Sequence, residues 1–436
     1  MGNFTFKGLF LAGLFMVLGC LSIQAADDGL ITEQVTVKMY KAGILLDKIG
    51  ANKKFKITNL KIIGKINGTD LRVIREMAGN DAWGNKTDGM LSVLDLSDAK
   101  IVEGGDSYCN TSLDKIGAGA FSGCRVLTNL TLPSSVTEID AGAFSGCSGL
   151  TSLTLPSGLT KIGAGAFSGC SGLTSLTIPS GVTEISYKAF YDCKGLTSLT
   201  LPSGVTEIAD QAFYGCSGLT SITLPSGVTR IGYWAFHGCS GLTSLALPSG
   251  LTWINSATFY GCSGLTSITF PSSLTGIDAS AFAGCSGLTS LTLPSGLIKI
   301  GDSAFSGCSG LVSLTFPSSV TFLGGSAFKD CSGLTSIYVY TEKLPETGVN
   351  VFNGCDAKKC TVYVPKGTYD DYWLSEFGYF ENIVEFDPTG INNVITSNDA
   401  KELSRYSLNG QRLSAPTKGL NIVKYSDGSV KKVAVQ

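Results

Sequence analysis

Residues 150–172 read LTSLTLPSGLTKIGAGAFSGCSG, and this 23-residue unit recurs along most of the chain. Self-similarity at a period of about 20–50 residues is typical of repeat architectures, in which each unit packs only against its two neighbours. The sequence therefore predicts one repeat solenoid rather than several globular domains. The period is marked by ten cysteines, each 23 residues from the next: Cys124, Cys147, Cys170, Cys193, Cys216, Cys239, Cys262, Cys285, Cys308 and Cys331.

The first half of each unit has the pattern of a short strand. Leu153 and Leu155 alternate with Ser152 and Thr154, which is the period-two signature of a strand with one buried face. Pro156 then ends the strand, because proline has no amide hydrogen to offer a sheet. We expect these strands to stack in parallel, with leucines inside and hydroxyls outside.

The second half of the unit returns the chain to the next strand. Its apolar positions, Ile162, Phe167 and Cys170, are three to five residues apart, a spacing that favours a tight helical turn over a second long strand. Each unit is thus predicted to be one coil of strand, corner and return. A single coil cannot bury its apolar side chains, so the core must form between stacked coils.

This LxxLxLP, I and AFxxC pattern resembles the BspA-like leucine-rich repeats of bacterial surface proteins, and the resemblance covers Leu91–Pro365. It implies a leucine-rich-repeat solenoid over residues 91–365, with a parallel β-sheet on one face and short helical turns. About a dozen residues are inserted around Asp106–Asp114. The resemblance also implies a non-enzymatic binding or adhesion scaffold at the cell surface.

An open stack needs covers at its two ends, because its terminal layers expose apolar faces. Residues 27–90 are the predicted N-terminal cap. They contain a strand candidate, Phe55–Ile66, and a short helix, Leu71–Met77, for which Thr69 or Asp70 is the expected N-cap. The segment NGTDLRVIREMAG is similar to the regions that precede such repeats.

The other end is predicted to have a C-terminal cap at residues 366–386, rich in aromatic side chains, followed by a small β module at 387–436. Two hairpins are expected in the module, at Tyr406–Leu413 and Ile422–Val433. The segments RYSLNGQRL and GLNIVKYSDGSVKKVAV resemble the C-terminal sorting domains of type IX secretion substrates. That resemblance implies export across an outer membrane.

The N-terminus has the pattern of a signal peptide, at residues 1–26, in which Lys7 precedes an apolar run, Leu9–Ile23. Two processing routes are open. Cys20 could carry a lipid, or the chain could be cleaved after the small residues Ala25–Ala26. The apolar stretch continues past Cys20, and this favours cleavage after Ala25–Ala26. We expect an exported protein at the outer membrane, on the cell surface or outside the cell, attached to a membrane only by that lipid or by C-terminal sorting.

Composition excludes several classes of function. The 32 basic residues nearly balance the 34 acidic ones, so no strong positive field attracts nucleic acid. His237 is the only histidine, which argues against histidine-based catalysis and multi-histidine metal sites. No catalytic residue, metal or cofactor is therefore expected, and we expect a monomer.

Fourteen cysteines in an exported chain would ordinarily indicate disulfides. Cysteines at one position of every coil, however, form a parallel row about 4.8 Å apart, which is wider than the Cβ spacing a disulfide prefers. They are predicted to be small buried hydrophobic residues. Only Cys355 and Cys360 break the period and could pair.

Aromatic residues gather on the middle coils, at positions where other units have Ser, Ala, Gly or a charged residue. Exposed Tyr and Trp provide contact area at low entropic cost, so this strip is the candidate ligand-binding site. The alternative is that the rings only stack on one another. We expect a protein partner, such as host matrix or another cell surface, or alternatively a glycan bound as part of a polysaccharide-capture system. The residues are Tyr187, Tyr191, Tyr214, Tyr233, Trp234, His237, Trp253 and Tyr260.

Overall fold

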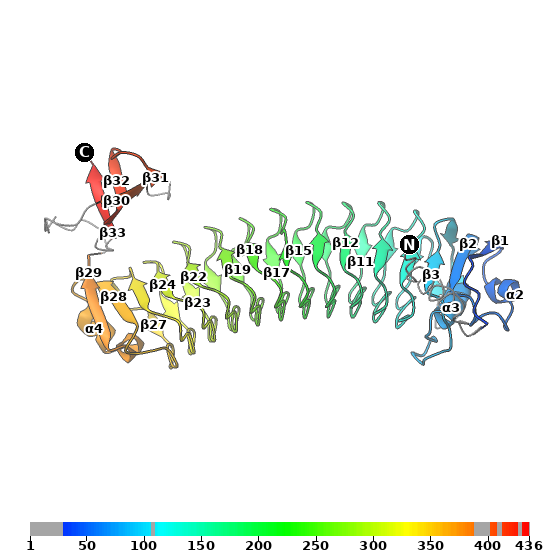
Figure 1. The fold of residues 1–436 in the computed structure, drawn as a ribbon, viewed down its shortest axis with the longest axis horizontal. Helices are drawn as coiled ribbons and strands as arrows, with labels where there is room; N and C mark the ends of the chain where they lie inside the picture. The colour runs from blue at the N-terminus through cyan, green and yellow to red at the C-terminus, as the bar shows by residue number, and fades with distance from the viewer. Residues whose placement is uncertain (1–28, 106–109, 388–401, 408–411, 426–429, 436) are drawn as a thin grey trace, which may run out of the picture.

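A computed structural model describes residues 29–105, 110–387, 402–407, 412–425 and 430–435. The repeats wind into a long, curved rod of stacked coils, which confirms the predicted solenoid (Figure 1). The expected signal peptide, with Cys20, lies outside the described residues.

One long side of the rod is formed by parallel strands, each aligned with the equivalent residues one repeat away, as Ser152 is with Asn129. Their middle residues are mostly buried, whereas the flanking Ser and Thr are mostly exposed, as the alternation predicts. These strands are β3 (Val93–Asp95), β8 (Asn129–Thr131), β10 (Ser152–Thr154), β12 (Ser175–Thr177), β14 (Ser198–Thr200), β16 (Ser221–Ile222), β18 (Ser244–Ala246), β20 (Ser267–Thr269), β22 (Ser290–Thr292), β24 (Ser313–Phe316), β26 (Ser336–Val339), β28 (Thr361–Pro365) and β29 (Asn382–Phe386).

The return half of each coil contains a second, two-residue strand, and these strands form narrow parallel sheets of their own. Consecutive tight turns follow, such as the bond from the Ala166 amide to the Gly163 carbonyl, in place of a continuous helix. The narrow strands are β7 (Lys115–Ile116), β9 (Glu138–Ile139), β11 (Lys161–Ile162), β13 (Glu184–Ile185), β15 (Glu207–Ile208), β17 (Arg230–Ile231), β19 (Trp253–Ile254), β21 (Gly276–Ile277), β23 (Lys299–Ile300), β25 (Phe322–Leu323) and β27 (Glu346–Thr347).

A column of phenylalanines runs through the core of the rod. One ring per coil stacks on the next with centroids 5.1–5.5 Å apart along the regular coils, from Phe121 to Phe328. All these rings are fully buried. Burial of such a side chain stabilises the fold by about 1.5–3 kcal/mol, so stacking between coils carries the stability of the rod.

The cysteines form a buried row of free thiols, as predicted, and Cys355 and Cys360 are also free. Each repeat thiol has a partner that the sequence does not indicate. The Cys170 Sγ donates to the Phe144 carbonyl oxygen 3.1 Å away, in the preceding coil, and that oxygen also accepts from the Cys147 amide. Burial raises the pKa of the Cys216 thiol to about 12, so it is a poor nucleophile at neutral pH.

The N-terminal end of the rod is formed by β1 (Val35–Met39), α2 (Leu45–Ile49), β2 (Asn59–Ile66), α3 (Gly68–Met77) and β4 (Ala99–Ile101). The antiparallel pair β5 (Gly104–Gly105) and β6 (Asn110–Thr111) lies in the insertion. The expected N-cap of α3 was wrong. Asn67 caps the helix, while the buried Asp70 accepts from the amides of Asn67, Gly43 and Leu45, which ties α3 to the segment before α2.

The C-terminal end of the rod contains α4 (Tyr369–Trp373) and the 3-10 helix η1 (Glu376–Tyr379) between β28 and β29. Tyr372 and Phe377 are buried there, and the Tyr372 hydroxyl donates to the Thr341 carbonyl oxygen at 2.9 Å. Further along the chain, an antiparallel sheet contains β30 (Glu402–Ser407), β31 (Arg412–Leu413), β32 (Gly419–Tyr425) and β33 (Val430–Val435).

Candidate functional site

Four of the predicted residues form a continuous ring stack on the turn side of consecutive coils. Tyr191 stacks on Tyr214 with centroids 4.8 Å apart, Tyr214 on His237 at 4.4 Å, and His237 on Tyr260 at 4.7 Å. The interplanar angles are 4–9°. Neighbouring rings therefore cover both faces of Tyr214 and His237, and these two residues can present only their edges to a partner.

His237 is half-buried in this stack. Tyr214 and Tyr260 exclude water from its two faces. Desolvation lowers the pKa of His237 below its ordinary 6.5, so the folded protein favours the neutral imidazole. Desolvation is the largest cause of this lower pKa, as expected for a ring packed between two others.

Acid should therefore weaken the folded state through His237. The unfolded chain binds this proton more readily than the folded chain, so the contribution of His237 is complete above about pH 6.5 and is lost as the pH falls through the lowered pKa. We expect urea unfolding at pH 7.5 and pH 5.0 to show a larger loss of stability in the natural protein than in His237→Phe, which keeps the stack. Equal losses in the two proteins would contradict this environment.

Tyr187 lies beside one end of the stack and is 45% exposed. The Lys188 ammonium is 5.1 Å from the ring centroid of Tyr187 and also 5.1 Å from that of Tyr191. Such cation–π contacts are worth about 0.5–1 kcal/mol at exposed sites. Lys188 thus links Tyr187 to the stack.

Tyr233 and Trp234 form an exposed pair at the tip of the coil that contains His237, with ring centroids 6.1 Å apart. The Asp210 carboxylate accepts from the Tyr233 amide at 3.0 Å and from Arg230 at 3.3 Å. Arg230 also pairs with Glu207. This network fixes the backbone that carries the two rings.

Trp234 has φ +54°, in the left-handed region that favours glycine. The equivalent residues of other coils are left-handed as well, both where they are glycine, as at Gly142 and Gly165, and where they are not, as at Lys188 and Gln211. Holding a non-glycine residue in this region costs about 1–2 kcal/mol. The conformation is therefore a feature of the repeat, and Trp234 differs from its equivalents in its large, exposed side chain.

Trp253 belongs to a different face. It is in β19 on the narrow sheet, and its ring occupies the space where a Cβ on Gly276 would stand. Among the described residues it makes no ring contact with the other seven aromatic side chains. The structure therefore brings Tyr191, Tyr214, His237 and Tyr260 together in the stack, with Tyr187 and the Tyr233–Trp234 pair close along the chain, and leaves Trp253 apart. We call the seven predicted residues other than Trp253 the aromatic cluster.

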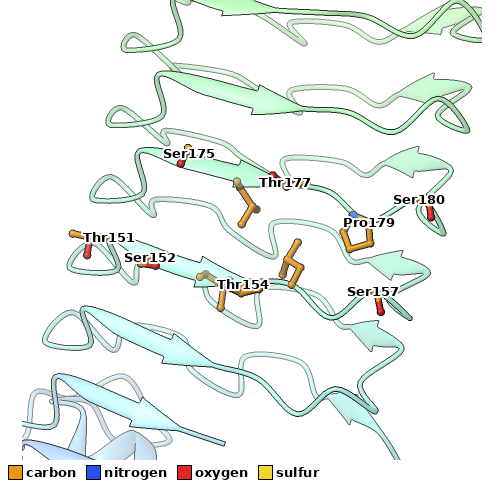
Figure 2. Close-up of a pocket in the computed structure, with 11 residues that line it drawn as sticks. Thr151, Ser152, Thr154, Ser157, Ser175, Thr177, Pro179 and Ser180 are labelled. Carbon is orange, nitrogen blue, oxygen red and sulfur yellow. The ribbon is translucent and has the colours of Figure 1, made fainter. Parts of the chain in front are cut away.

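A hydroxyl-lined pocket opens on the wide strand face between β10 and β12 (Figure 2). These two strands belong to different hydrogen-bonded sheets. On the return side of the same junction, the Ser186 hydroxyl donates to the Ile162 carbonyl, a position where other coils use a backbone amide. The pocket has no charged residue in its lining, which consists of Thr151, Ser152, Leu153, Thr154, Leu155, Ser157, Ser175, Leu176, Thr177, Pro179 and Ser180.

Chemistry-bearing groups do not converge elsewhere in the described part of the chain. Within those residues, no group of three or more His, Cys, Asp or Glu side chains could hold a metal ion. No helix there is long and apolar enough to cross a membrane. The aromatic cluster is thus the best candidate for a functional surface.

Comparisons with known proteins agree with the repeat. A model described as "BspA type Leucine rich repeat region" matches in six copies, over residues 107–217, 183–286 and 253–372. A leucine-rich repeat protein from Bacteroides ovatus is 26% identical over 65% of this chain and 90% of its own, with a TM-score of 0.40. A leucine rich cell surface protein from Faecalibacterium prausnitzii is 26% identical over 66% of this chain and 86% of its own, with a TM-score of 0.36. No curated protein matches the chain. Since the matched repeats span more than half of the sequence, the chain belongs to the BspA-type leucine-rich repeat family.

Proposed function

We propose that this protein is an exported, non-enzymatic scaffold that binds a protein partner at the cell surface through the aromatic cluster. Leucine-rich-repeat proteins are typically scaffolds for protein interaction or adhesion, and this chain belongs to such a family. The observation that carries the proposal is the exposed ring pair of Trp234 and Tyr233. In an earlier coil the small residues Ala164 and Gly165 occupy the positions of Tyr233 and Trp234.

Ring geometry favours a protein over a glycan. Sugars stack on open aromatic faces, but the faces of Tyr214 and His237 are covered by neighbouring rings. Lys188 lies over Tyr187 and Tyr191. The accessible features of Tyr214 and His237 are ring edges and polar tips, which suit the hydrogen bonds and side-chain contacts of a protein surface.

Export is supported by the sequence of the two ends. The apolar segment in residues 1–26 has the pattern of a signal peptide, and residues 387–436 resemble a sorting domain. We propose caps at 27–90 and 366–386 around a solenoid at 91–365. In this arrangement the rod would be displayed outside the cell with its aromatic cluster accessible.

The test uses the full chain and replaces the Tyr233–Trp234 tip with the residues of an earlier coil. Tyr233→Ala with Trp234→Gly reproduces Ala164–Gly165, so the tip remains compatible with the fold. Binding is measured by surface plasmon resonance against purified extracellular matrix proteins, and in parallel on a glycan array. We expect a matrix or surface protein to bind, and the double variant to bind at least about tenfold more weakly with an unchanged melting temperature.

The matched control is a second exposed Tyr–Trp pair. Tyr369 and Trp373 on α4 stack at 6.0 Å and are 39% and 47% exposed. Tyr369→Ala with Trp373→Ala should leave binding unchanged. The proposal would be wrong if both double variants bound equally well, or if defined glycans bound and proteins did not.

A further inference from the structure

The partner of the aromatic cluster can be narrowed by the spacing of its exposed rings. Tyr187 and Tyr233 occupy the same position on coils two repeats apart, and Asp210 occupies it on the coil between them. Parallel strands are about 4.8 Å apart, so two coils span roughly 9.6 Å. A polyproline II helix has three residues per turn and a rise of about 3.1 Å per residue, which gives about 9.3 Å per turn.

The space between the two rings is occupied by a shorter side chain that is turned toward the backbone. The Asp210 carboxylate is engaged by the Tyr233 amide and by Arg230. Arg230 also pairs with Glu207, so one cation is shared by two carboxylates. Two rings separated by a smaller side chain that is already hydrogen-bonded fit a partner with a ridged surface.

The polar groups of the cluster can donate hydrogen bonds. In contrast to Tyr372 and Tyr379, whose hydroxyls donate to carbonyl oxygens of the rod, Tyr191, Tyr214 and Tyr260 have no such bond among the described residues. The indole of Trp234 is a donor only. A polyproline II segment has no internal hydrogen bonds, and its proline residues offer carbonyl acceptors without amide donors. Donor-rich tips and acceptor-rich peptide are therefore complementary.

We infer that the aromatic cluster binds a proline-rich peptide segment in the polyproline II conformation, with one turn of the peptide seated between Tyr187 and Tyr233. This inference rests on the proposed protein-binding function and specifies its partner. Aromatic surfaces that present donors are a general solution for recognising this conformation, because the peptide is already extended and loses little entropy on binding. The peptide lies along the rod axis, and its turns follow alternate coils.

The experiment titrates the full chain into a fluorescein-labelled nona-proline peptide and measures fluorescence anisotropy. A glycine–serine peptide of equal length is the flexible control, and (Pro-Pro-Gly)10 presents the same backbone conformation as a triple helix. We expect nona-proline to bind and the glycine–serine peptide not to bind. If (Pro-Pro-Gly)10 also binds, triple-helical partners are included; if only nona-proline binds, the partner is a single strand.

Two variants test the ring spacing. Tyr187→Ala should weaken nona-proline binding about tenfold, and Ala164 shows that alanine suits this position. Adding Ala164→Tyr to Tyr187→Ala restores the number of exposed rings but places them three coils apart. Because the spacing no longer matches one peptide turn, this double variant should bind as weakly as Tyr187→Ala alone.

Recovery of full affinity in that double variant would overturn the inference, because binding would then depend on the number of rings and not on their spacing. Failure of nona-proline and (Pro-Pro-Gly)10 to bind would also overturn it. The proposed function would survive that failure if a matrix protein still required the Tyr233–Trp234 tip.

Discussion

Replacing Phe236 with alanine is expected to lower the free energy of unfolding by about 3–5 kcal/mol, the usual loss for a buried phenylalanine. The ring is fully buried and stacks on Phe213 at 5.1 Å and on Phe259 at 5.5 Å. Both neighbours would line the resulting cavity. The column is continuous, so Phe213 or Phe259 could fill the cavity only by moving away from the phenylalanine on its other side. Urea unfolding followed by circular dichroism measures the loss.

Phe322 provides the control within the same chain. It is in β25 on the narrow sheet, only half-buried, with the Lys299 ammonium 5.4 Å from its ring centroid. Phe322→Ala should cost less than about 1 kcal/mol, because little buried apolar area is lost. If Phe236→Ala cost no more than Phe322→Ala, the phenylalanine column would not be the core of the rod.

The main features of the fold could be predicted because the repeat samples every position many times. The alternation of Leu153 with Ser152 and Thr154 identifies a half-buried strand, and one repeat after another preserves it. The unbridged cysteine row could be predicted in the same way, since a 23-residue period places the thiols in register. In both cases a strong geometric constraint links sequence to structure.

The narrow sheet could not be predicted because β11 is only two residues long, too short to show alternation. Nor does the sequence reveal that the Cys170 thiol donates to the Phe144 carbonyl, because a buried cysteine satisfies the same apolar pattern with or without that bond. At α3, Thr69 and Asp70 are good capping residues, but Asn67 makes the cap because Asp70 is occupied by amides from a distant segment.

The sequence alone identifies the residues of the aromatic cluster, but their arrangement is visible only in the structure. Equal spacing indicates that Tyr191, Tyr214, His237 and Tyr260 share one position, but not whether their faces or edges are accessible. Gly142 and Gly165 at the position of Trp234 indicate a left-handed backbone there, and Lys188 shows that the position also accepts a larger residue.

A methyl group at Gly149 is expected to be almost as damaging as the loss of a core ring. A Cβ at this position would stand 2.1 Å from the Arg125 carbonyl oxygen of the preceding coil, and that obstacle is backbone, which no side-chain rotation can remove. The same approach recurs at Gly172 and Gly195, where the distances are 2.5 and 2.2 Å. Gly149→Ala should therefore destabilise the rod by about 3 kcal/mol, at the upper end of the usual range for overpacking.

Gly158 provides the matched control, because the same substitution there should not lower the free energy of unfolding. Nothing lies within 4 Å of a Cβ at Gly158, which is exposed at the corner after β10. Gly158→Ala should leave stability unchanged or raise it by about 0.4–1 kcal/mol, since alanine reduces the entropy of the unfolded chain. Thermal and urea unfolding of both variants measure the difference. If the two variants changed stability by similar amounts, the glycine at the coil junction would reflect backbone entropy alone. A large loss of stability confined to Gly149→Ala would show that close contact between coils sets the pitch of the rod.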